Sequence, residues 1–202
     1  EATNSATTAA VAESAAATSV STAATAPGVT ASTRIATGNL GGGFPYLGTF
    51  MFLQWPAPAL NPTMYFEFSV APAAGYQVQY QSMDFAAFVG GSGGNWTMEV
   101  HASLDGFATS DIPLFTQSIA RDGSAHIFDG LDISALGTQS ATVTFRYYMY
   151  RPAASQQGWA GLMQANDYGP AKNFFVNGIV TGPPLATEPT TWGRVKALYA
   201  GE

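Results

Sequence analysis

Apolar and polar residues alternate along several segments in the middle of the chain. In residues 64–70 apolar side chains stand at every second position, and residues 96–103 and 142–149 follow the same period of two. This period is typical of a β-strand with one buried and one solvated face. Several such strands predict two antiparallel sheets packed face to face. The apolar positions of these segments, and of residues 76–80, are Met64, Phe66, Phe68, Val70, Tyr76, Val78, Tyr80, Trp96, Met98, Val100, Ala102, Val143, Phe145, Tyr147 and Met149.

The breaks between these segments carry residues that favour tight turns. Glycine adopts the positive φ angles that hairpin turns require. The turn dipeptides are Asp105-Gly106, Asp122-Gly123, Asp129-Gly130 and Asn177-Gly178. No long amphipathic helix pattern appears between residues 35 and 180. We therefore predict an all-β domain over residues 35–180, an antiparallel two-sheet sandwich of jelly-roll-like type.

Residues 1–34 form a distinct N-terminal arm. Of the first 33 residues, 25 are Ala, Ser or Thr, and none is aromatic. Such a segment cannot build a core of its own, so in isolation we expect it to be disordered. Its larger apolar residues, Val11, Val20 and Val29, are the candidates for contact with a sheet. Whether the arm docks on its own domain or on a neighbouring subunit stays open.

Residues 181–202 form a third zone, a Pro-rich linker followed by a short amphipathic segment. Thr191 is a plausible N-cap for a C-terminal helix of about two turns, which Gly201 would end. Isolated helices of this length are marginal in water, so this one would need a surface to dock on. Its apolar face would consist of Trp192, Val195, Leu198 and Tyr199.

The charge balance excludes two classes of partner. The chain has 202 residues with 13 acidic and 7 basic side chains, a net charge of −6, and only 10% of its residues are charged. Nucleic-acid binding and polybasic membrane association both need clustered Lys and Arg, and the basic residues here are scattered. We therefore expect neither partner.

The sequence also restricts redox chemistry and the compartment. There are no cysteines, so disulfides and thiolate metal sites are excluded. No apolar run reaches the ~18 residues of a membrane helix. The first residue is Glu1 rather than methionine, which suggests an exported protein whose leader has been removed, at the cell surface or outside the cell.

The search for catalytic or metal-binding residues gives weak candidates. His101 and His126 belong to no metal-binding motif, and we expect ordinary strand residues. Glu67 and Glu99 stand on polar strand faces and could form the carboxylate pair of a glycosidase, although solvent-facing residues are the simpler interpretation. The turn aspartates could hold a structural calcium, but none matches the EF-hand spacing. We predict a protein that is not an enzyme and needs no cofactor.

Aromatic residues offer an alternative function. Tyr148 and Tyr150 share a strand face with Arg146, and Trp159 stands in a Gly-flanked segment that we interpret as a loop. If these rings are exposed, they form a platform for stacking on sugars. The other interpretation is that they pack in the sandwich core and beneath loops.

Several short motifs occur in an order that resembles a known family. They are Tyr65-Phe66-Glu67-Phe68-Ser69-Val70, Ser103-Leu104-Asp105-Gly106-Phe107 and Val143-Thr144-Phe145-Arg146-Tyr147-Tyr148. This order resembles the exported domain of bacterial PEP-CTERM-type (exosortase-substrate) surface proteins, in which an SLDGF turn and a TFR strand recur in a β-sandwich. The resemblance implies an extracytoplasmic bacterial protein of largely non-enzymatic, surface or matrix character. Residues 189–202 depart from the family pattern, which has a membrane helix there, so the resemblance implies no exosortase anchor.

Two functions follow as hypotheses. In the first, the protein is an extracellular structural subunit of a bacterial surface filament or matrix array, and its partners are copies of itself. The arm would add as a strand to the sheet edge of the next subunit. The alternative is a carbohydrate-binding module of an exported protein, with a polysaccharide ligand at Tyr148, Tyr150 and Trp159.

Overall fold

The computed structural model describes the backbone of residues 4–12, 19–24, 28–31, 34–37, 43–46, 49–53, 58–91, 94–151, 158–163 and 175–183. Side chains are described within 28–30, 58–90, 94–151 and 176–183. The elements are β1 (Asn4–Ala12), β2 (Ser19–Ala24), β3 (Val29–Ala31), β4 (Arg34–Thr37), β5 (Gly43–Tyr46), β6 (Thr49–Leu53), β7 (Tyr65–Pro72), β8 (Gln77–Gly91), β9 (Trp96–Ser103), β10 (Ile112–Ile119), β11 (His126–Asp132), a 3-10 turn η1 (Ser134–Leu136), β12 (Thr138–Gln139), β13 (Val143–Tyr150), β14 (Gly158–Met163) and β15 (Phe175–Thr181).

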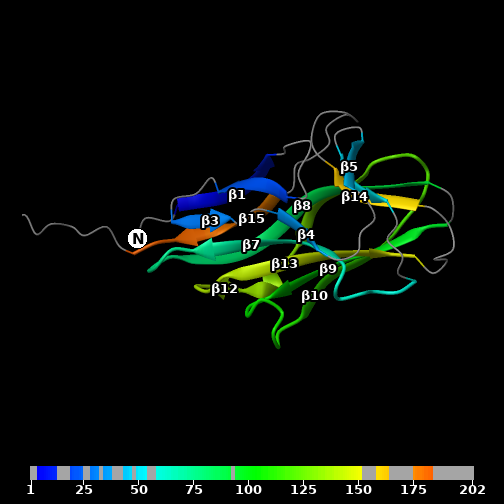
Figure 1. Cartoon of the computed structure of the whole chain (residues 1–202). Coiled ribbons are helices and arrows are strands. Elements are labelled where there is room, and N and C mark those ends of the chain that lie inside the picture. The colour runs from blue at the N-terminus through cyan, green and yellow to red at the C-terminus, as the bar shows by residue number, and fades with distance from the viewer. Residues whose placement is uncertain are drawn as a thin grey trace, which may run out of the picture.

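The strands form two antiparallel layers, so the predicted all-β sandwich is confirmed (Figure 1). One layer runs in the order β10-β9-β13-β7, and both β3 and β4 pair with β7. The long strand β8 lies at the centre of the other layer and pairs with β11, β12, β14 and β15. The expected C-terminal helix lies outside the described residues.

Aromatic side chains from the two layers meet in the core. Phe68 of β7 stacks on Phe145 of β13 with ring centroids 5.0 Å apart. Tyr80 of β8 meets the edge of Phe145 at 5.9 Å, and Phe85 meets Tyr147 at 5.5 Å. All five rings are at most 2% exposed. The predicted alternation is therefore confirmed, because the apolar positions of these strands face the opposite layer.

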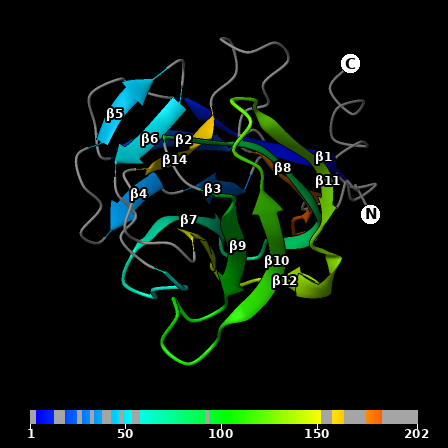
Figure 2. The same ribbon diagram turned by 90° about the vertical axis from the view of Figure 1, so that its right-hand side faces the viewer.

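Within this single chain, the described strands of the N-terminal arm pair with both layers. β1 pairs with β15 of one layer and with β2, and β2 pairs with β4 of the other layer. These two strands therefore join the layers along one side of the sandwich, which we call the seam. In Figure 2 the dark blue β1 crosses the upper part of the molecule, above β7, β9 and β10. Val11 lies on β1 and Val20 on β2, while Val29 opens β3 and is only 8% exposed.

Two of the four expected turns are confirmed, because Gly106 and Gly123 lie between strands with positive φ angles of 71° and 77°. The other two predictions were wrong. Asp129-Gly130 lies inside β11, at an irregularity in its pairing with β8 where Gly130 has a φ of 68°. Asn177-Gly178 lies inside β15, also at an irregularity in its pairing with β8. A Cβ on Gly178 would lie 2.5 Å from the carbonyl oxygen of Gln79, so glycine permits a close backbone approach here rather than a turn.

Candidate functional site

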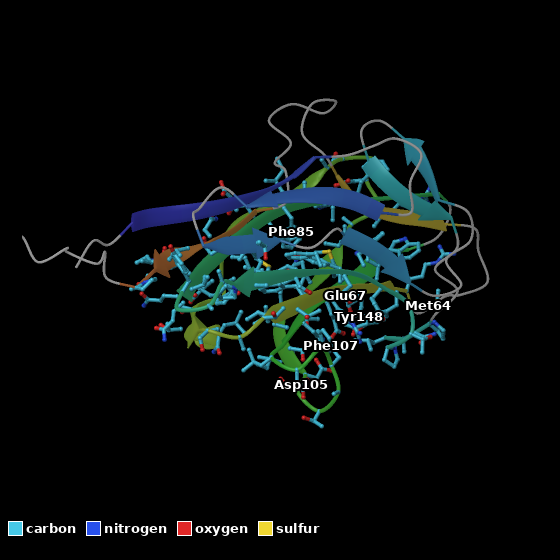
Figure 3. All side chains as sticks on the ribbon, turned by 60° about the vertical axis from the view of Figure 1, so that its left-hand side comes forward. Met64, Glu67, Phe85, Asp105, Phe107 and Tyr148 are labelled. Atoms are coloured by element: carbon cyan, nitrogen blue, oxygen red, sulfur yellow. The ribbon has the colours of Figure 1, made fainter. Side chains whose placement is uncertain are left out.

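Among the described residues, a group of charged and aromatic side chains contact one another on the outer face of the β10-β9-β13-β7 layer. Its position follows from the pleat, since residues opposite one another on neighbouring strands share a face. Arg146 of β13 is opposite Glu67 of β7 on one side and His101 of β9 on the other. Tyr148 is opposite Glu99. Figure 3 shows Glu67, Tyr148 and Phe107 close together on this side of the layer.

Arg146 is held on three sides. Its Nε donates to Glu67 Oε2 at 2.6 Å, and both side chains are largely buried. The guanidinium carbon lies 3.9 Å from the centre of the Tyr65 ring and 4.1 Å from that of Phe107. A cation between two aromatic faces is attracted by both ring quadrupoles. The guanidinium is therefore fixed in place rather than free to reach a ligand.

His101 lies between two carboxylates. Its Nδ1 is 2.6 Å from Asp111 Oδ1, and its Nε2 is 3.0 Å from Glu99 Oε2. An imidazolium donates to both acceptors, whereas a neutral imidazole has only one N–H to donate. Tyr150 donates its hydroxyl to the other oxygen of Glu99 at 2.5 Å. This hydrogen bond, together with burial, raises the pKa of Tyr150.

The loop between β9 and β10 places Phe107 over Arg146. Asp105 accepts hydrogen bonds from the backbone N–H groups of Ala108, Thr109 and Ser110, and from the hydroxyls of Ser103 and Thr109. Ser103 Oγ in turn accepts from the N–H of Phe107 at 2.7 Å. Phe107 itself has a φ of 67°, which is uncommon outside glycine. The SLDGF motif therefore specifies a closed loop that delivers one aromatic ring to Arg146.

The loop should weaken in acid, and Asp105→Asn should remove most of that dependence. Hydrogen bonds from Thr109 and Ser103, with backbone N–H groups, lower the pKa of Asp105 below its ordinary value of 3.8. A lowered pKa in the folded state adds stability that is fully present above the unfolded value and is lost as the pH falls below it. We expect proteolysis of this loop to accelerate below about pH 4 in the wild type. Equal acid sensitivity in Asp105→Asn would contradict this role.

The structure does not arrange Glu67 and Glu99 as a catalytic pair. They share the outer face, but β13 lies between their strands, so two strand spacings put about 10 Å between their backbones across the sheet. Each carboxylate also has a partner, Arg146 for Glu67 and both His101 and Tyr150 for Glu99. These contacts favour a static polar network over the facing carboxylates of a glycosidase.

The predicted sugar platform is not formed as expected. Tyr148 is 3% exposed and packs edge-on against His101, with centroids 5.2 Å apart, so the expectation of an exposed ring was wrong. Tyr150 is only partly exposed. Trp159 lies on β14, a strand of the opposite layer rather than a loop. The alternation could not reveal this, because it shows only that two residues share a face and not what covers that face.

The other predicted site residues are dispersed. The turn aspartates Asp122 and Asp132 accept N–H groups of their own turns, from Ser124 and Ser134. His126 Nε2 lies 2.8 Å from the carbonyl oxygen of Ala120. Within the described part of the chain, no three His, Asp or Glu side chains converge as metal ligands. Trp192, Val195, Leu198 and Tyr199 lie outside the described residues.

Sequence reasoning missed three members of the network: Tyr65, Phe107 and Asp111. Tyr65 stands on the polar face of its strand, two positions before Glu67, so its place beside Arg146 could have been inferred from the alternation. Phe107 and Asp111 come from a loop, and their positions depend on the path of that loop.

No helix in the described ranges is long and apolar enough to cross a membrane.

Comparisons with known proteins give little further information. No family model and no curated protein matches the chain. Among solved structures, the infectious bursal disease virus VP2 subviral particle matches with 12% identity and a TM-score of 0.28, over 81% of this chain and 39% of that one. The infectious bursal disease virus Gx strain matches with 11% identity and a TM-score of 0.28, over 83% and 40%. The chain thus spans about two fifths of these proteins, and such low TM-scores imply nothing about what it binds.

Proposed function

We propose that this protein is a non-catalytic structural subunit that joins copies of itself through its N-terminal strands. The observation that carries the proposal is the seam. A segment that cannot build its own core provides β1 and β2, and these strands pair with a strand edge in each layer. An identical segment from another copy offers the same side chains and backbone groups to the same two edges.

The other sheet margins support this choice of interface. Natural proteins block exposed edges with proline, bulges or charges. Among the described strands, β5 and β10 end the sheet, and they contain Pro45 and Pro113 respectively. β11 pairs with β8 through an irregular register and carries Asp129 and Asp132. By contrast, β1 and β2 contain neither proline nor a charged residue.

The polar network on the outer face supports a structural role as well. Arg146 contacts the Glu67 carboxylate, and His101 contacts that of Asp111. The rings of Tyr65 and Phe107 cover the Arg146 guanidinium. These contacts give that layer a fixed outer surface. In a head-to-tail assembly, such subunits would form a fibre whenever the rotation between neighbours does not close a ring. Low overall charge reduces repulsion between copies.

Blocking β1 should prevent assembly. Thr8 pairs with Asn177 of β15, and a proline at position 8 has no N–H for this ladder. We expect full-length Thr8→Pro to lose polymers in sizing chromatography and negative-stain electron microscopy. Thr8→Val keeps both the backbone donor and a strand-forming side chain, so it should assemble normally. If the wild type remains monomeric at high concentration, or if Thr8→Pro still polymerises, the proposal is wrong.

The setting of this assembly is part of the proposal. An extracellular or cell-surface location accords with the resemblance to exported bacterial surface proteins. Binding of a polysaccharide remains an untested alternative, and a glycan array would reveal it. The burial of Tyr148 reduces the surface available for such a ligand.

A further inference from the structure

The ring of Tyr76 packs against the chain at two places, just before β3 and just after β15. A Cβ on Gly28 would lie 2.5 Å from Cγ of this ring, and a Cβ on Gly182 would lie 2.5 Å from its Cε1. Gly28 precedes β3, and Gly182 follows β15. The ring therefore packs directly against both backbones. We call Gly28, Tyr76 and Gly182 the tyrosine clamp.

The residues that follow Gly28 are anchored in the domain. The carbonyl oxygen of Gly28 accepts a hydrogen bond from the N–H of Ala73 at 2.7 Å. Val29 belongs to the buried core, and Thr30 pairs with Ala71 of β7. Removing these residues would leave a hole in the core, so β3 is an integral part of its own domain.

The residues before Gly28 are attached differently. β1 and β2 pair with each other and with the edges of β15 and β4, along the seam. We infer that residues 1–27 of one copy enter the seam of a second copy, while β3 stays paired with β7 of its own chain. This inference rests on the proposed function. The tyrosine clamp is the boundary between the exchanged and the retained parts.

The physical basis is that exchange conserves the seam contacts. The same strands meet the same edges in the closed monomer and in the exchanged assembly, so the two states differ mainly in the connection between Ala24 and Gly28 and in the entropy of association. Protein concentration then determines which state is populated.

Engineered cysteine pairs can distinguish the two states, because the chain has no native cysteine. Directly opposed residues lie within disulfide range. Thr8→Cys with Asn177→Cys reports on β1 and β15, and Val20→Cys with Arg34→Cys reports independently on β2 and β4. Thr30→Cys with Ala71→Cys reports on β3 and β7. Ala10→Cys with Ala23→Cys is the matched control, because both positions belong to the arm.

The readout is non-reducing gel electrophoresis of full-length assembled protein after oxidation. We expect the two seam pairs to give ladders of covalent oligomers, with most of the cross-linked chains in dimers or larger species. The β3–β7 pair and the control should give cross-linked monomers only. Because Asn177 donates hydrogen bonds to Ser82 and Asp84, the single Asn177→Cys variant shows whether the substitution itself alters assembly.

Each of the other possible outcomes would refute a specific part of the inference or of the proposed function. Polymers whose seam pairs cross-link only within one chain would retain the structural function but refute exchange at the seam. A ladder from the β3–β7 pair would show that the exchanged unit extends beyond the clamp and would refute that boundary. A monomer with all four pairs closed internally would refute both the inference and the proposed function.

Discussion

Gly28→Ala should lower the free energy of unfolding by about 2–4 kcal/mol, because two separate costs combine at this position. The first is conformational, since Gly28 has a φ of 77°, where an L side chain is strained. The second is steric, since the added methyl group would overlap the ring of Tyr76. Urea denaturation followed by tryptophan fluorescence measures the loss.

Gly123→Ala is the matched control for the steric cost. Gly123 has the same φ of 77°, but nothing lies within 4 Å of the position that its Cβ would occupy. We therefore expect only the conformational cost, about 1–2 kcal/mol. Tyr76→Ala should reduce the difference between the two alanine variants. Equal losses at Gly28 and Gly123 would show that the tyrosine ring yields easily and that the clamp is weak.

Phe145→Ala should cost about 3–5 kcal/mol, the range for removing a buried aromatic ring from a packed core. Phe145 is 0% exposed and contacts Phe68 and Tyr80, which belong to strands of the two different layers. Its loss leaves a cavity between the layers that the flanking strands cannot close. Thermal and urea unfolding measure the effect.

Ile127→Ala provides the comparison for Phe145→Ala. Ile127 lies on β11 and is 44% exposed, so its truncation should change stability by about 0.5 kcal/mol or less. Because Phe145 precedes Arg146, the core variant should also loosen the polar network. A loss at Phe145 no greater than that at Ile127 would contradict the proposed arrangement of the core.

The parts that could be predicted from the sequence are those set by local chemistry. Alternation along residues 64–70 and 96–103 identified the buried faces, because the side-chain period of a strand is fixed. Asp-Gly dipeptides at residues 105 and 122 identified turns, because glycine has no Cβ to restrict φ. The alternation also placed Glu67, Glu99 and Arg146 on polar strand faces.

Predictions that depended on distant segments were incomplete or wrong. Tyr148 stands on the predicted polar face but is buried against His101. Trp159 lies on a strand of the other layer rather than in a loop. Gly178 serves a close approach to Gln79 and not a turn. In each case the deciding contact comes from a segment far away in the sequence, which a local pattern does not specify.

The sequence by itself therefore determined the β class, the buried face of each main strand and the local turns, because these follow from side-chain period and from backbone freedom. Only the tertiary structure decided where the N-terminal arm pairs, which carboxylate meets which cation, and why Gly28 and Gly182 are glycines. Those features arise where strands distant in the sequence become neighbours. The arm shows the difference most clearly: its composition indicates only that it needs a partner surface, and the edges of β15 and β4, which pair with β1 and β2, supply that surface.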